Sequence, residues 1–155
     1  MQKVRKTARQ ILLDHPREVI SVGPDDSVLT ALLLMADKDI STVLVMQGDN
    51  LAGILSQRDY ARKVETAGRT AAATKVREIM TTQVICVPPE RTCDQCLALM
   101  HTRRIRHLPV MEEQRVLGVV SNSDVLEELI REDEHFIQDL EHDLFHLTVD
   151  TGGCY

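Results

Sequence analysis

Hydrophobic positions along the chain change their period in a fixed order, and this order occurs twice. Residues 19–22 form a β-branched run that ends at a Gly-Pro pair, as expected of a short strand. Ser27 then stands as the N-cap of a helical pattern whose apolar face holds Val28, Ala31, Leu32 and Met35. Strands are predicted next at 42–46 and 51–55, and a second helix is predicted from Ser56. The pattern predicts a β-α-β-β-α unit, and so an α/β (α+β) fold.

An internal repeat accounts for this order. A shift of 65 positions superimposes residues 19–59 on residues 84–124 without a gap, and 13 of the 41 positions are identical. Chance alone would give about 2 or 3. An upstream fragment matches at a shift of 68, so the first copy carries three more residues around 14–18. We predict two pseudo-symmetric repeats packed as a pair, with these boundaries: repeats at 7–66 and 74–131, an acidic C-terminal helix at 132–147 and a flexible tail at 148–155.

The motifs of the two copies resemble one family. Both copies end alike, in Gly-Ile-Leu-Ser-Gln-Arg-Asp at 53–59 and Gly-Val-Val-Ser-Asn-Ser-Asp at 118–124, and the second contains Ile-Arg-His-Leu-Pro-Val at 105–110. These motifs resemble the paired cystathionine-β-synthase (CBS) domains, or Bateman module, and look most like a stand-alone subgroup associated with AMP and NAD. The resemblance implies a non-enzymatic regulatory module for signal transduction. It would sense an adenosine nucleotide in the cleft between the repeats and regulate a protein partner that the sequence does not identify.

A Ser-x-x-Asp motif occupies the same place in both copies, as Ser56 with Asp59 and as Ser121 with Asp124. On its own, this motif is typical of a capping box, in which the acid also complements the positive end of the helix dipole. A fixed carboxylate can equally accept both hydroxyls of a ribose diol, as in dinucleotide-binding folds. Because the motif is duplicated in a chain that resembles a binding family, we predict that it holds the ribose of a ligand.

Cations are expected at the other end of such a ligand, because a carboxylate repels phosphate. Arg104, Arg106 and His107 lie at the start of the buried strand of the second copy, and the resemblance implies that Arg106 and His107 contact phosphate. A solvated helix end is the alternative reading of this cluster. Thr42 is the counterpart of His107. The two sites are therefore expected to be unequal: one cleft faces the cations of the second copy, and the other cleft offers mainly hydroxyls.

Three further residues complete the predicted ligand-binding set. Arg58 is the preferred candidate for a second phosphate, whereas Arg62 and Lys63 are explained equally well as solvated charges. Ile20 and Ile85, an identical pair in the first strands, are expected to line the sites. AMP is the leading ligand, and ATP and NAD(H) remain alternatives.

Cys93 and Cys96 have the Cys-x-x-Cys spacing of zinc and thiol redox sites. The repeat alignment places them at the positions of Val28 and Ala31, on the apolar face of a helix, and a second pair of ligands at suitable spacing is not visible. We therefore predict that both thiols pack in the core and hold no metal.

Charge and hydropathy bear on partners and location. Residues 124–150 hold ten acids and one base, Arg131, in a chain of formal charge −6 with no Trp and only two Phe and two Tyr. Such a segment repels phosphate backbones, so nucleic acid is not an expected partner. The longest apolar stretch, 28–36, is too short to span a membrane. With no secretory pattern and four cysteines, a reducing, cytoplasmic location is expected.

The C-terminal helix carries an apolar stripe that includes Ile137, Leu140 and Leu144. An apolar stripe on an acidic helix favours contact with another surface, and we predict a homodimer to which this helix contributes. His142 and His146 are spaced to share a metal, but a solvated helix end is favoured.

Two other classes of function remain as alternatives to the sensor. A ligand-free structural or adaptor CBS pair would act through protein contacts alone. An enzyme is disfavoured, because neither a paired acid and base nor a nucleophile with a partner is visible in the sequence.

Overall fold

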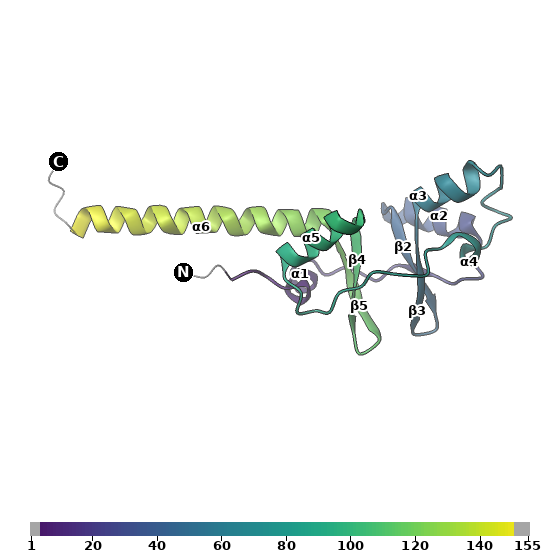
Figure 1. The fold of residues 1–155 in the computed structure, drawn as a ribbon, viewed down its shortest axis with the longest axis horizontal. Coiled ribbons are helices and arrows are strands. Elements are labelled where there is room, and N and C mark those ends of the chain that lie inside the picture. Colours follow the sequence, from purple (N-terminus) through teal and green to yellow (C-terminus); the bar gives the residue numbers. More distant parts are fainter. Residues whose placement is uncertain (1–3, 151–155) are drawn as a thin grey trace.

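The computed structural model describes residues 4–150, apart from the side chains at 136, 137 and 139–150. Two β-hairpins lie beside each other, and a long helix projects from one of them (Figure 1). The first half of the chain contains α1 (Ala8–Asp14), β1 (Ser21–Val22), α2 (Val28–Lys38), β2 (Thr42–Gln47), β3 (Asn50–Ser56), α3 (Gln57–Tyr60) and a π-helical turn, η1 (Ala61–Glu65). The second half contains α4 (Val76–Ile79), α5 (Cys93–Arg103), β4 (His107–Glu112), β5 (Arg115–Ser121) and α6 (Asn122–Asp150). The predicted α+β fold is confirmed.

The sheets follow the predicted repeat, with one difference. β1 pairs in parallel with β2, and β2 pairs antiparallel with β3, whereas the second sheet contains only the antiparallel pair β4 and β5. The strand predicted at the start of the second repeat is reduced to one bridge, between Val87 and Val110. In the first repeat, Leu44 N donates to Ile20 O. Pro109 stands at the position of Leu44 and has no N–H, so the matching hydrogen bond cannot form.

Each sheet is packed on a core of its own. The first core contains residues of α2, β2 and β3, and the second core contains residues of α5, β4, β5 and α6. The short helices are exchanged between these cores. Ala8 and Ile11 of α1 lie in the second core, whereas Val76 and Ile79 of α4 lie in the first. The helix that opens each sequence repeat therefore completes the core of the other repeat, and the two repeats form one interlocked unit.

The exchanged helices approach the hairpins closely at two equivalent glycines. A Cβ atom on Gly53 of β3 would lie 2.8 Å from the backbone O of Thr81, and one on Gly118 of β5 would lie 2.8 Å from Cδ2 of Leu12. Thr81 and Ile54 also exchange two backbone hydrogen bonds, of 2.9 and 3.0 Å. The chain after α4 is thereby fixed along β3, which brings the second half of the molecule beside the first hairpin.

Cys93 and Cys96 are fully buried in the second core, so the prediction that they pack there is confirmed. Burial, together with the negative charges of Glu132 and Glu128, raises the pKa of the Cys93 thiol to about 12. A thiol with this pKa stays protonated at neutral pH and has little nucleophilic or metal-binding character.

α6 begins next to Ser121 and continues to Asp150, three residues beyond the boundary predicted at 147. No Gly or Pro interrupts residues 122–150, and the first helix-breaking residue is Gly152. The predicted stripe of Ile137, Leu140 and Leu144, and the pair His142 and His146, lie outside the described side chains. Among the described residues, no helix combines the length and the apolar character needed to cross a membrane.

Candidate functional site

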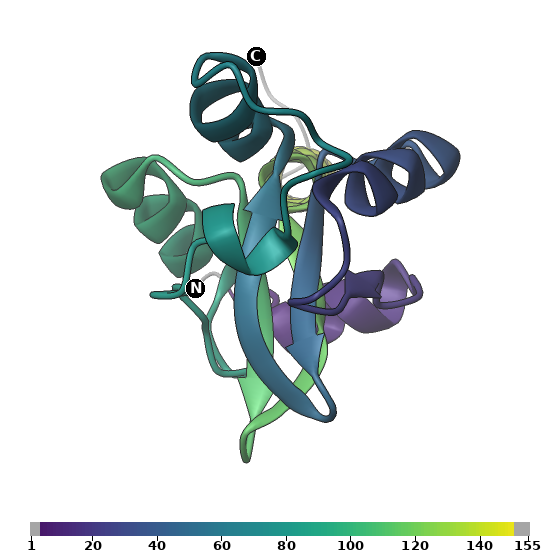
Figure 2. The same cartoon turned by 90° about the vertical axis from the view of Figure 1, so that its right-hand side faces the viewer.

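A cleft of about 750 Å³ opens between the first hairpin and the chain that leads into β4. Figure 2 shows the two hairpins one in front of the other, with α2, α3 and α5 gathered towards one end of both. Residues of both repeats line this Asp59 cleft. The first repeat provides Ser41, Thr42, Ile54, Ser56, Gln57, Arg58, Asp59, Arg62 and Lys63, and the second provides Thr81, Gln83, Val84, Ile85, Arg104, Ile105, Arg106 and His107.

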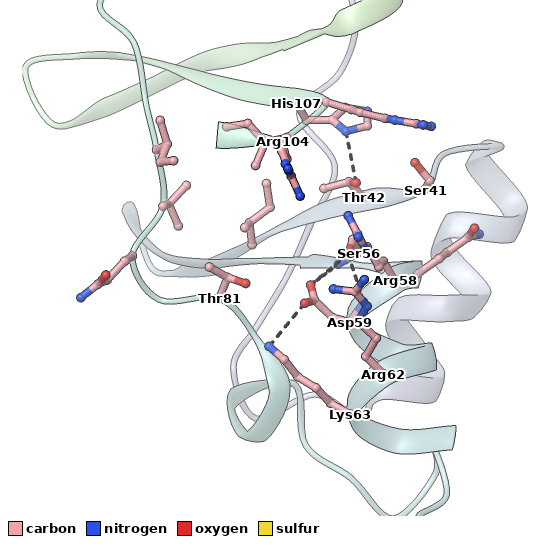
Figure 3. A pocket seen from close by; sticks show the side chains of 17 residues that line it. Ser41, Thr42, Ser56, Arg58, Asp59, Arg62, Lys63, Thr81, Arg104 and His107 are labelled. Carbon is pink, nitrogen blue, oxygen red and sulfur yellow. Dashed lines mark hydrogen bonds and ion pairs between the residues drawn. The ribbon is translucent and has the colours of Figure 1, made fainter. Parts of the chain in front are cut away.

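Asp59 and Ser56 form a reciprocal cap at the start of α3. Ser56 Oγ accepts from the backbone N of Asp59 at 3.2 Å, and Asp59 Oδ2 accepts from Ser56 N at 2.9 Å and from Ser56 Oγ at 3.0 Å. The capping role of the motif is thus present. It also orients the carboxylate, because Ser56 holds Oδ2, whereas Lys63 Nζ is the one partner of Oδ1 among the described residues, at 3.4 Å. Figure 3 shows this carboxylate within the cleft.

Positive charge dominates the cleft wall. Lys63 is held between Asp59 and the backbone O of Ile79, to which Nζ donates at 2.8 Å. Within the described part of the chain, no hydrogen bond or ion pair engages four guanidinium groups of the lining: Arg58, Arg62, Arg104 and Arg106. Uncompensated cations around a single carboxylate create a positive potential, which attracts anionic ligands.

The backbone positions Arg104 at the edge of this cleft. Arg104 ends α5 in the left-handed conformation, with φ 55°, as its repeat counterpart Asp39 ends α2 with φ 52°. Two residues later, Arg106 O accepts from Asn122 N at 2.7 Å, which ties the start of β4 to the start of α6. The arginines of the second repeat are therefore carried by backbone that is fixed at both ends.

His107 and Thr42, which occupy equivalent positions in the two repeats, meet at the centre of the pair. Thr42 Oγ1 and His107 Nδ1 lie 3.3 Å apart, at hydrogen-bonding distance (Figure 3). Burial lowers the pKa of His107, the charge of Arg106 lowers it further, and Asp124 opposes both. His107 is therefore neutral at pH 7, so it offers a phosphate a ring N–H rather than a full charge.

The second Ser-x-x-Asp motif has different surroundings. Ser121 Oγ accepts from Asp124 N at 3.2 Å, as in the first copy, but both carboxylate oxygens of Asp124 also face Arg17. Arg17 Nη2 donates to Oδ1 at 2.7 Å and Nη1 donates to Oδ2 at 3.2 Å. Burial raises the pKa of Asp124, yet hydrogen bonds from Ser121 and the charge of Arg17 outweigh it and hold the pKa below its ordinary value. We call the surroundings of this carboxylate the Asp124 site.

The cleft brings together most of the predicted ligand-binding residues: Thr42, Ser56, Arg58, Asp59, Ile85, Arg104, Arg106 and His107. Ser121, Asp124 and Ile20 do not line it. The prediction missed Thr81 and Arg17. Thr81 joins the cleft because α4 packs on the first core, and Arg17 lies in the segment around 14–18, where the first repeat is three residues longer than the second. Among the described residues, no cluster of His, Cys, Asp and Glu has the composition of a metal site.

The fold and the cleft are those of a pair of small α+β repeats that build a ligand-sized site between them. The sequence matches the CBS domain over residues 9–66 and 76–131. The chain belongs to the CBS-domain family, with two copies in tandem.

Relatives of several kinds share this pair. A CBS-domain protein from Burkholderia ambifaria has a solved structure with 43% sequence identity and a TM-score of 0.78, covering 81% of this chain and 95% of that one. The mitochondrial CBS domain-containing protein CBSX3 of Arabidopsis thaliana is 36% identical over 121 residues, 75% of this chain and 59% of its own length. Inosine-5'-monophosphate dehydrogenase of Methanocaldococcus jannaschii is 31% identical over 128 residues, 81% of this chain but only 24% of the enzyme. The chain therefore spans less than two thirds of these two curated relatives.

Proposed function

We propose that this chain is a non-enzymatic regulatory module that binds an adenosine nucleotide in the Asp59 cleft. One observation carries the proposal: a single oriented carboxylate shares a cleft of about 750 Å³ with guanidinium groups from both repeats. Asp59 Oδ1 is available to the hydroxyls of a ribose, and the arginines are available to phosphate. The apolar side chains of Ile54 and Ile85 provide surfaces for a base.

A solved CBS pair of the same fold supports this choice of ligand class. It was obtained in complex with 5'-methylthioadenosine and S-adenosyl-L-methionine, with 21% sequence identity and a TM-score of 0.70 to this chain. A pair of this fold can therefore accommodate an adenosine group. The positive charge of the Asp59 cleft favours a phosphorylated adenosine ligand, AMP first, with ATP and NAD(H) as its competitors.

Calorimetric titration of AMP, ATP and NAD into the full chain tests the proposal. Asp59→Asn keeps the shape and the cap but removes the charge that strengthens the ribose hydrogen bonds. Loss of charge-assisted bonds worth about 1.5 to 3 kcal/mol should weaken binding roughly 10-fold to 100-fold. Asp124→Asn is the matched control, since it makes the same change in the same motif outside the cleft, and it should leave this affinity unchanged.

If the chain is instead a ligand-free adaptor, none of these nucleotides should bind. If none of the three nucleotides binds and none raises the melting temperature, the Asp59 cleft is not a nucleotide site and the chain acts through protein contacts. If nucleotide binds equally well to the Asp59→Asn chain, the Ser-x-x-Asp motif is only a helix cap.

Self-association is part of the proposed function. A homodimer supported by α6 would place a partner surface next to the acidic helix, and a chain ending at Arg131 should then dimerise less tightly while it keeps its nucleotide cleft. Light scattering of both chains at matched concentrations measures this. If the full chain and the shortened chain have the same dimer mass at all concentrations, α6 does not support the dimer and would contact a different partner.

A further inference from the structure

The two copies of the Ser-x-x-Asp motif differ in the charge around them. Four cations of the Asp59 cleft have polar or acidic counterparts in the other repeat: Arg58, Arg62, Lys63 and Arg104 align with Ser123, Glu127, Glu128 and Asp39. The Asp124 site therefore lacks the positive wall that an anionic ligand needs. Glu127 and Glu128, which follow Asp124 on α6, pair with Arg131 and Lys6, so these two cations are engaged there.

Arg17 is the cation that pairs with Asp124. It lies between α1 and β1, in a segment that is three residues longer than the matching segment of the second repeat. Its guanidinium reaches Asp124 across 107 positions of sequence and engages both carboxylate oxygens, at 2.7 and 3.2 Å. The side chain of Asp124 is only 7% exposed, whereas that of Arg17 is 61% exposed. The carboxylate is fixed in the protein, and the arginine covers it from the solvent side.

This geometry matches the way in which a carboxylate would hold a ribose. Two adjacent hydroxyls and the two N–H groups of a guanidinium are both paired donors that a carboxylate accepts side by side. At Asp59 no guanidinium of the described residues takes this place, and Oδ1 pairs with the ammonium group of Lys63 instead. At Asp124 the place is already taken.

We propose that Arg17 is an internal competitor for Asp124, which keeps the Asp124 site weak towards nucleosides and leaves the Asp59 cleft as the stronger site. This inference rests on the proposed function for its ligand class. A ribose can reach Asp124 only after displacing two charge-assisted hydrogen bonds. Once Arg17 is removed, the site should gain affinity for an uncharged nucleoside, whereas it would still lack the cations that a phosphate needs.

The test uses the full chain and adenosine, which carries no phosphate, measured by equilibrium dialysis. All chains carry Asp59→Asn, so that binding at the Asp59 cleft is weakened and the Asp124 site is read separately. Adding Arg17→Gln should tighten adenosine binding about 10-fold or more, and adding Asp124→Asn as well should remove the gain. Arg9→Gln is the matched control, because Arg9 is also half-exposed and paired with an acid, Glu112, far from the motif. It should change nothing.

The outcomes separate the two proposals. Adenosine binding that is unchanged or weaker after Arg17→Gln, or a gain that survives Asp124→Asn, would overturn the role of Arg17. Arg17→Lys keeps the charge with a single ammonium group, and adenosine affinity between those of the arginine and glutamine chains is expected. The nucleotide affinity of the unmodified chain plays no part in these comparisons, so a failure of the Asp59 proposal would appear in that titration alone.

Discussion

Gly53 is the position at which a single methyl group should do the most damage to both the fold and the cleft. A Cβ atom there would lie 2.8 Å from Thr81 O and 2.9 Å from Met80 Sδ. Thr81 O cannot move freely, because it accepts from Ile54 N and because Thr81 N donates back to Ile54 O. Gly53→Ala must therefore push the chain after α4 away from β3, and with it one wall of the Asp59 cleft.

The expected cost follows from these contacts. Overpacking of this kind costs about 1 to 3 kcal/mol, and weakening one buried hydrogen bond adds about 0.5 to 1.5 kcal/mol. Because alanine lowers the conformational entropy of the unfolded chain, the substitution also stabilises the folded chain by about 0.4 to 1 kcal/mol. We expect a net loss of about 2 to 3 kcal/mol in the free energy of unfolding, which corresponds to a melting temperature lower by about 5 to 10 °C. AMP affinity should fall as well, since Ile54 and Thr81 both line the cleft.

Two other glycines provide the comparison, in urea denaturation followed by circular dichroism. At Gly118 the methyl group meets Leu12 Cδ2, the movable end of a side chain, so Gly118→Ala should cost about 1 kcal/mol or less. Gly48 has φ +63° and open space around it, so Gly48→Ala should lose about 1 kcal/mol from backbone strain without affecting AMP. Equal losses for Gly53→Ala and Gly118→Ala would refute the argument, because only the first displaces backbone.

Three further predictions concern charge and burial. Because the pKa of His107 is lowered in the folded chain, the unfolded chain takes up this proton first. The free energy of unfolding should fall as the pH drops below about 6.5. His107→Gln should make the urea midpoint depend less on pH in this range, and an unchanged pH dependence would contradict the prediction. Lys6→Met removes the ammonium group that lies 2.8 Å from the buried carboxylate of Glu128, and it should lower the free energy of unfolding by about 1 to 3 kcal/mol. Adding Glu128→Gln should restore part of this stability, and a double variant less stable than Lys6→Met would contradict the prediction. Of the four thiols, Cys93 and Cys96 should react with Ellman's reagent only as the chain unfolds, so rapid reaction of more than two would disprove their burial.

The sequence repeat was enough to predict most of the fold and of the cleft, because equivalent residues of two similar repeats face each other when the repeats pair. Thr42 and His107 illustrate this, since they share a position and lie in contact. Other features depend on contacts that no local pattern carries. The loss of a strand beside Pro109 follows from one missing N–H, and the pairing of Arg17 with Asp124 arises from a loop whose length differs between the repeats.

The exchange of α1 and α4 has a consequence for how the chain folds as it is synthesised. The buried residues of the first core all lie at or before Ile79, so this core can close while most of the second half is still being made. The second core holds Ala8 and Ile11 together with Val125, so the earliest helix to emerge must wait for some of the last residues of the pair. Contacts this distant in sequence close slowly, since a long loop must be ordered before they form. Folding of the pair should therefore finish when α1, its first helix, docks on a second half that is already assembled.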